Sequence, residues 1–290
     1  MLYTADNAKL QINGNEILAS NASLALNANL QPSYLITQRN TNTYAPSNGI
    51  GGQLSFNYYL TGRDYFKSFI TGQGEKDVET TVISGNFGGL NFDSGYLTSY
   101  SVNFGPNAPA VASANVQFFD QLEGEFVSGQ EKAPEDTQIL NLKNASVVGD
   151  LASGEVENFI GGTYNYSCDV TPVYLMNETK PSNVSFGAKT VNVNFEIDNP
   201  TGYLPVSGTE AKISLNLKNY SNTNIENFTC SGLIQQRSLA SAVGDYIKQS
   251  ITIVQNSTEG SSIFIDTISA GTVSEAVGIG STGSDIPPSG

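Results

Sequence analysis

Apolar and polar residues alternate along many short segments of this chain. Every second residue is apolar in the segment 24–30, and the same alternation appears in LSFNY at 54–58. Successive residues of a β-strand face opposite sides of a sheet, so each segment predicts a strand with one buried face. The segments are separated by stretches rich in Gly, Asn and Ser, which favour turns. The sequence therefore predicts a mainly β protein.

The pattern of the first half recurs in the second half. LQPSYLI at 30–36 and VTPVYLM at 170–176 share Pro, Tyr and Leu at the same places, 140 residues apart. The matched positions at offsets of 139–140 are Leu24/Tyr164, Leu26/Tyr166, Ala28/Cys168, Leu30/Val170, Phe56/Phe195 and Gly62/Gly202. Further along, Ile83–Gly85 matches Cys230–Gly232 at an offset of 147, and 96–104 matches 246–254 at 150. These matches predict an internal duplication into two similar β-sandwich or barrel domains, with insertions absorbed by loops.

A charged, Pro-containing stretch without periodicity separates the matched halves and is typical of a linker. We place a first β domain at 1–130, a linker at 131–138 and a second β domain at 139–268. The Gly- and Ser-rich end at 269–290 is expected to be a flexible tail.

One segment predicts a helix. In GRDYFKSFIT at 62–71, Tyr65, Phe66 and Phe69 form one apolar face behind Asp64, a residue type that caps helix starts. The matching segment in the second half contains Pro205 and is not expected to be helical.

The charge of the chain restricts its partners. The net charge is −14, with only 13 Lys and Arg. Six basic and thirteen acidic residues precede position 140, and seven and fourteen follow, so each half carries −7. A groove for nucleic-acid phosphates needs clustered Lys and Arg, so we expect no specific binding of DNA. Acidity that only keeps the protein soluble is the alternative.

The chain lacks the residues of the common catalytic sites. It contains no histidine, which removes the usual triads, His-ligated metals and the usual general base at neutral pH. Glu123 with Glu125, and Glu75 with Asp77 and Glu79, could pair as carboxylates, but a solvated face is the favoured interpretation.

A glycine motif near the C-terminus also fails to predict a site. GIGSTG at 278–283 matches a nucleotide-binding pattern, but SDIPPSG follows it and supplies no helix N-terminus for a phosphate. We therefore expect no enzyme, and no catalytic, cofactor-binding or metal-binding residues.

Two further features concern the cysteines and the location. Cys168 and Cys230 match apolar positions of the first half, so we predict two buried, unreactive thiols. The N-terminus carries Asp6 and Lys9 where a signal peptide needs an apolar run, and no stretch approaches a membrane span. We expect synthesis in a host cytoplasm and no membrane contact.

The first half resembles the tail-tube-type structural proteins of tailed bacteriophages. The resemblance is carried by NGIGGQLSFNYYLTG at 48–62, with LQPSYLI before it and the helix candidate after it, and by ISGNFGGLNFDSGYLTSYSVNF at 83–104. It implies, for each half, a β-sandwich with a flanking helix. It also implies that six such domains close a ring with a continuous inner β-barrel, so that three two-domain chains suffice.

The resemblance implies a virion protein whose rings stack into a tube that conducts the genome. Its partners would be copies of itself and other virion proteins, and an acidic channel would let DNA pass without sticking. Two alternatives stay open. One is a capsid decoration or neck protein, and the other is a glycan- or receptor-binding β-sandwich using Tyr58, Tyr59, Tyr164 and Tyr166.

Overall fold

A computed structural model describes most of the two halves of the chain. The described residues are 9–28, 30–34, 43–46, 49, 51–62, 64–72, 82–105, 108–126, 146–150, 159–176, 178, 180–198, 208, 210–218, 224–241, 243 and 247–255. The expected linker at 131–138, the tail at 269–290 and the matched glycine Gly202 lie outside these residues.

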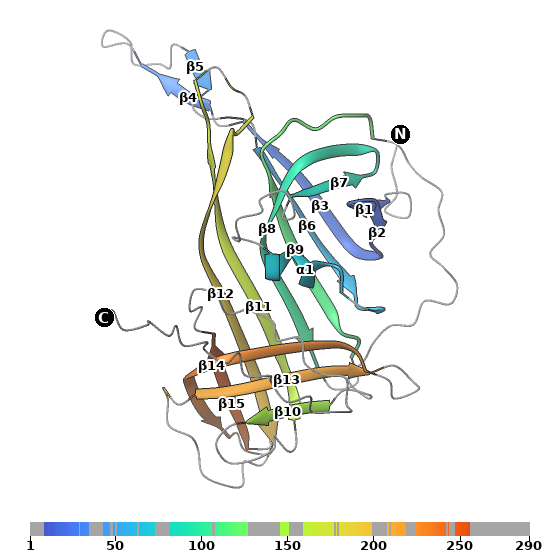
Figure 1. Ribbon diagram of the computed structural model, residues 1–290, viewed down its shortest axis with the longest axis vertical. Helices are drawn as coiled ribbons and strands as arrows, with labels where there is room; N and C mark the ends of the chain where they lie inside the picture. Colours follow the sequence, from blue (N-terminus) through green and yellow to red (C-terminus); the bar gives the residue numbers. More distant parts are fainter. Residues whose placement is uncertain are drawn as a thin grey trace, which may run out of the picture.

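The described part is mainly β, as predicted, with one short helix (Figure 1). The first half contains β1 (Leu10–Ile12), β2 (Asn15–Glu16), β3 (Ala19–Asn27), β4 (Leu30–Ser33), β5 (Thr43–Pro46), β6 (Gly51–Tyr59), α1 (Phe66–Gly72), β7 (Ile83–Phe87), β8 (Leu90–Phe104) and β9 (Val111–Phe118). The second half contains β10 (Ser146–Asp150), β11 (Phe159–Val173), β12 (Asn183–Asp198), β13 (Glu210–Lys218), β14 (Asn224–Ala240) and β15 (Lys248–Val254).

Thirteen of the strands form one antiparallel sheet that runs through both halves. The first half has the order β3-β6-β9-β8-β7-β1-β2, and the second has β11-β12-β15-β14-β13-β10. The halves join where β11 pairs with the C-terminal part of β8, from Gly162 opposite Phe104 to Ser167 opposite Ser99. The N-terminal part of β8 pairs with β7 along the same edge, so one edge of β8 serves two neighbours in turn.

The two halves share their strand order. Reading from β3 and from β11, the strands β3, β6, β9, β8, β7 and β1 correspond in order to β11, β12, β15, β14, β13 and β10. The registers correspond too: Leu24 is opposite Leu54, and Tyr164 is opposite Val193, which keeps the offsets of 140 and 139. Common ancestry of the halves stays a prediction, but their pairing is the same.

Irregularities of the sheet recur at corresponding positions. The register slips by one residue between Ala19 and Asn21 in β3, and between Phe159 and Gly161 in β11. It slips again between Leu97 and Ser99 in β8, and between Ile234 and Gln236 in β14, at an offset of 137. A bulge increases the local twist of a sheet, so the corresponding strands bend at the same places.

Two of the sequence matches are shifted by one strand. Ile83–Gly85 lies on β7, whose counterpart in strand order is β13, whereas Cys230–Gly232 lies on β14. The segment 96–104 lies on β8, whereas 246–254 overlaps β15, the counterpart of β9. Consecutive strands with the same alternation are interchangeable in a short comparison, which explains the shift.

The first match also breaks at one end. The alternation from 24 to 30 predicts one strand, but β3 ends at Asn27, and Leu30 begins β4, which pairs only with β5 in a separate sheet. The matching residues 164–170 all lie in the single strand β11.

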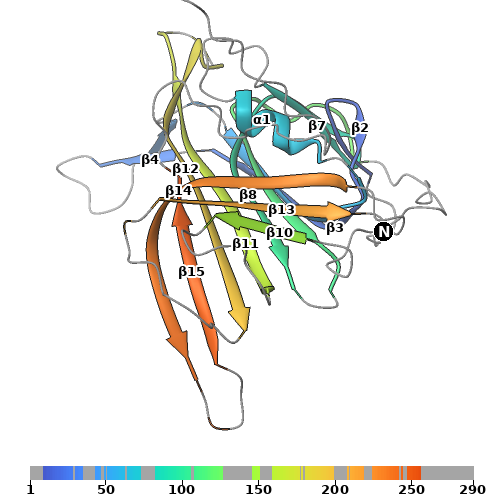
Figure 2. The same ribbon diagram turned by 60° about the horizontal axis from the view of Figure 1, so that its bottom comes forward.

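One apolar core passes through both halves. The first part of β14, with β13, crosses over the β8–β11 junction, so the second half is sandwich-like there (Figures 1 and 2). Phe228 of β14 packs on Tyr164 of β11 and on Phe104 of β8, with ring centroids 5.5 and 5.7 Å apart. The seam between the halves is therefore covered by the same core that stabilises each half.

The predicted helix and the predicted burial of the thiols are confirmed. Helix α1 covers Phe66–Gly72 and buries Phe66 and Phe69 in the aromatic cluster of the first half. Cys168 and Cys230 are both buried and unpaired. No helix in the described part of the chain has the length and apolar character that crossing a membrane requires.

Candidate functional site

A buried carboxylate lies where β6 leads into helix α1. Asp64 is 7 % exposed and accepts hydrogen bonds from the Tyr58 hydroxyl, at 2.9 and 3.0 Å to its two oxygens. The Tyr100 hydroxyl donates to Oδ2 of the same carboxylate. The backbone N–H of Phe66 donates to Oδ1 at 2.9 Å, so Asp64 also caps the helix, as its sequence position predicts.

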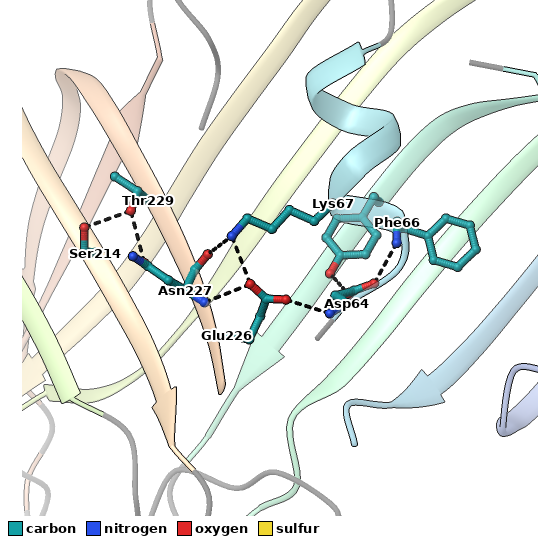
Figure 3. Close-up of polar contacts among 8 residues, drawn as sticks. Asp64, Phe66, Lys67, Ser214, Glu226, Asn227 and Thr229 are labelled. Atoms are coloured by element: carbon teal, nitrogen blue, oxygen red, sulfur yellow. Dashed lines mark hydrogen bonds and ion pairs between the residues drawn. The ribbon is translucent and has the colours of Figure 1, made fainter. Parts of the chain in front are cut away.

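A second buried carboxylate reaches this cluster from the other half of the chain. Glu226 on β14 is 4 % exposed, and its Oε2 accepts the backbone N–H of Asp64 at 2.6 Å. Its Oε1 lies 2.9 Å from Nζ of Lys67, which also donates to the backbone oxygen of Asn227 at 2.7 Å. Figure 3 shows α1 and β14 held together by these contacts. We call Tyr58, Asp64, Lys67, Tyr100 and Glu226 the clamp.

The clamp continues along β14 into β13. The Thr229 hydroxyl donates to Oδ1 of Asn227 at 3.1 Å and lies 2.9 Å from the hydroxyl of Ser214 (Figure 3). Buried polar networks fix one arrangement of a core when each member has its partner. This network fixes how the second half lies on the first.

Burial dominates the electrostatics of the clamp. Removal from water raises the pKa of Asp64 from 3.8 to about 6, with the charge of Glu226 adding to the rise, although hydrogen bonds from Tyr100, Phe66 and Tyr58 oppose it. Burial, followed by the nearby Asp64 charge, raises the pKa of Tyr58 and that of Tyr100 well above 10.0. Both tyrosines therefore stay neutral donors at neutral pH.

The carboxylate oxygens of the clamp all have partners within the protein. The oxygens of Asp64 and Glu226 are occupied by protein donors, and a catalytic acid or base must reach a substrate proton. Two hollows in the described part of the molecule are lined by other residues. The chemistry available to the clamp is ion pairing between the halves, with one carboxyl that titrates near neutrality.

The larger hollow offers little to a cofactor. It measures about 500 Å³ and is lined by Asn27, Gly49, Gly51, Gly52, Gln53, Thr98, Gln117, Phe119, Thr171, Pro172 and Tyr174. None of these residues is charged, and no group of three metal-ligating side chains occurs among the described residues. The smaller hollow, about 20 Å³, is an apolar void under the β8–β11 junction.

Two of the sheet edges that the described strands leave unpaired lie on β3 and on the C-terminal part of β14. β3 pairs with β6 on one side and with no other strand of the described chain. In β14, residues 236–240 pair only with β15, because β13 pairs with 224–233. Both edges carry exposed apolar side chains: Leu26 is 47 % exposed and Leu239 is 54 % exposed.

Those residues singled out by the sequence that the structure describes are not assembled into a site. Glu123 and Glu125 are both exposed, which agrees with a solvated face. Glu75, Asp77 and Glu79 lie outside the described residues, as does GIGSTG at 278–283. Of the four tyrosines considered for glycan binding, Tyr58, Tyr164 and Tyr166 are buried in the core, and Tyr59 is half-buried.

Sequence reasoning missed Glu226 and did not locate the two edges, although short strands in each half predict that edges remain unpaired. Glu226 lies on the apolar face of the strand NIENFTC, in phase with Phe228 and Cys230, and this position is the one sequence signal of a buried carboxylate. Its partners lie about 160 residues earlier, and no local pattern marks them.

A scan against protein-family models finds no match for this chain, and a search of curated proteins finds none.

Proposed function

We propose that this chain is a virion structural protein, a subunit of a phage tail tube, whose copies assemble edge to edge into stacked rings around an acidic channel for DNA. The observation that carries the proposal is the β8–β11 junction, which joins two halves of like strand order in one sheet. The contact between the two halves of one chain is thus of the same kind as the contact that neighbouring copies would make around a ring. Head-to-tail contacts close into a ring when the rotation allows.

The size of such a ring fits a channel. Each chain supplies eight strands to a continuous path, β3-β6-β9-β8-β11-β12-β15-β14, so three chains would supply 24. With strands about 4.8 Å apart and tilted about 40°, the barrel is roughly 48 Å across between backbones. Side chains on the inner face fill about 5 Å on each side, which leaves an opening wider than duplex DNA.

The charge supports passage of DNA rather than binding. The chain carries −14, shared equally by its halves, and like charge prevents the phosphate contacts that would hold a polyanion. Three chains are the favoured stoichiometry, with other virion proteins as further partners. A decoration or neck protein is the runner-up with the same self-association, and burial of three of the four tyrosines disfavours the glycan-binding alternative.

Electron microscopy of the purified protein, with light scattering over a range of concentrations, tests the proposal. We expect rings and stacked tubes with a central opening. A protein that stays monomeric at the highest concentration, or that binds capsid shells without forming rings, would refute the tube assignment.

A further inference from the structure

We infer that β3 of one copy pairs antiparallel with residues 236–241 of β14 and its continuation in a second copy, with Leu24 opposite Leu239. This inference rests on the proposed function and identifies the surface through which the copies associate. The partner is a second copy of this chain, joined head to tail.

The argument starts from the junction that exists inside the chain. There, β11 lies against the C-terminal part of β8, beyond the point where β7 leaves the same edge. In strand order β3 corresponds to β11 and β14 corresponds to β8. Both counterparts are unpaired in the matching places within the described chain: β3 on the side away from β6, and β14 beyond the point where β13 leaves it. The chain therefore offers a free donor strand and a free acceptor edge of the kind that it already joins once.

The register follows from the corresponding positions. Inside the chain, Tyr164 is opposite Val102, and Tyr166 is opposite Tyr100. The offset of 140 between β3 and β11 comes from their pairing with β6 and β12, and the offset of 137 between β8 and β14 comes from their shared bulge. Applied to the internal junction, these offsets give the pairs Leu24/Leu239, Leu26/Arg237 and Ala22/Ser241 between copies.

Pairing of β3 with β14 between copies would cover side chains that are exposed at the two open edges. Tyr166 and Val102, at the internal junction, are 2 % and 0 % exposed. Their counterparts Leu26 and Leu239 are 47 % and 54 % exposed. An exposed apolar strand edge invites pairing with another chain, and cross-strand apolar pairs stabilise it.

Unsatisfied polar atoms lie at the same edge of β14. Nε and Nη2 of Arg237 are buried without a hydrogen-bond partner among the described residues, as is Nε2 of Gln249 on the adjacent strand β15. Leu239 is opposite Gln249 in the β14–β15 register. Buried donors normally find acceptors, and a strand laid on this edge brings a row of backbone carbonyl groups close to them.

The two edges do not meet within one copy: in the described chain β3 pairs with β6 alone, β14 pairs with β13 and β15, and the sheet does not close between them. The contact is therefore between copies and heterologous, with the donor strand of one copy on the acceptor edge of the next.

Cysteine cross-linking tests the register. Opposite residues of an antiparallel pair have Cα atoms about 4.5–5.5 Å apart, within the range that a disulfide spans. The full chain with Leu24→Cys and Leu239→Cys should give a ladder of disulfide-linked multimers under mild oxidation. The matched control, Leu24→Cys with Ser238→Cys, places the thiols on opposite faces of the sheet and should give no ladder.

Mixing single variants tests the direction of the contact. Leu24→Cys mixed with Leu239→Cys should give a cross-linked dimer, whereas each variant alone should give none, because a heterologous contact never brings identical residues together. A dimer from Leu24→Cys alone would overturn the inference.

Charge changes give a second, independent measurement. Leu239→Glu should abolish multimers and leave the circular dichroism spectrum of the folded chain unchanged, because Leu239 is exposed. Leu24→Lys combined with Leu239→Glu should restore them. Leu175→Glu is the control, since Leu175 is 58 % exposed and lies on neither edge.

The outcomes separate this inference from the proposed function. Rings or tubes that form without the Leu24–Leu239 cross-link, and that survive Leu239→Glu, overturn the inference and leave the tube assignment standing. Cross-linked head-to-tail multimers that never stack into tubes support the inference and refute the tube assignment. A chain that remains monomeric throughout overturns both.

Discussion

Replacing Asp64 by Asn should remove a part of the pH dependence of stability that has an unusual sign. Surface carboxylates paired in the native state make proteins less stable as the pH falls, but burial raises the pKa of Asp64 from 3.8 to about 6. The folded state thus binds this proton more tightly than the unfolded state does. The contribution is fully present below pH 3.8 and is lost as the pH rises through 6.

The magnitude follows from the two pKa values. Linkage between pH 7 and pH 5 gives a gain of about 1 kcal/mol in the free energy of unfolding on acidification. Asn is nearly isosteric with Asp: its oxygen can still accept the Phe66 N–H, and its amide can donate to the oxygen of Tyr58 or Tyr100. The variant should therefore fold while lacking this gain.

Urea unfolding at pH 7, 6 and 5, followed by circular dichroism at a concentration that keeps the chain monomeric, measures the effect. The difference in unfolding free energy between wild type and Asp64→Asn should change by about 1 kcal/mol between pH 7 and pH 5, in favour of the wild type at pH 5. Asp93→Asn is the control, because it removes the same charge from an exposed side chain. Parallel pH profiles for wild type and Asp64→Asn would refute the buried, titrating carboxyl.

Three further changes probe other features. Glu226→Ala removes the acceptor of the buried Asp64 N–H and the ion-pair partner of the half-buried Lys67, and should lower the free energy of unfolding by about 1–3 kcal/mol in urea, against little change for the exposed control Glu125→Ala; equal effects would count against the clamp. Gly232→Ala should destabilise by about 1–3 kcal/mol in the same assay, because its new Cβ would meet a backbone oxygen of the adjacent strand; a neutral result would show that the strands can separate there. Burial raises the pKa of the Cys168 thiol and that of Cys230, the latter to about 12, so an aromatic disulfide reagent should label both slowly until urea unfolds the chain; fast labelling of the folded chain would contradict their burial.

The sequence predicted best those features that depend on residues close together in the chain. The alternating pattern of β3 and β6 predicted the matching strands β11 and β12 in the correct register. One face of each strand is apolar, and a shift by one residue would turn that face to solvent. The helix was predicted because Asp64 caps an aromatic face. The later matches slipped by a whole strand, since the alternation in β7 and β8 is shared by β13, β14 and β15.

What the sequence could not predict depends on contacts between distant segments. Glu226 shares a strand face with the buried Phe228 and Cys230, but no local pattern shows that α1 supplies its partner Lys67. The common sheet of the two halves depends on which of several free edges meet, and the edges of β8 and β14 look alike in sequence pattern.

The clamp also has a consequence for the order in which the chain folds. The hydrogen bond between Asp64 and Glu226 joins residues 162 positions apart, whereas the pairing of β8 with β9 and β7 closes short loops. Closing long loops costs more chain entropy, and contacts between distant residues slow folding. During synthesis on a ribosome, Asp64 and Lys67 emerge well before Glu226. Helix α1 therefore gains its contacts with Glu226 only after β14 has been synthesised. The clamp is therefore a late step, and weakening it should speed unfolding more than it slows folding.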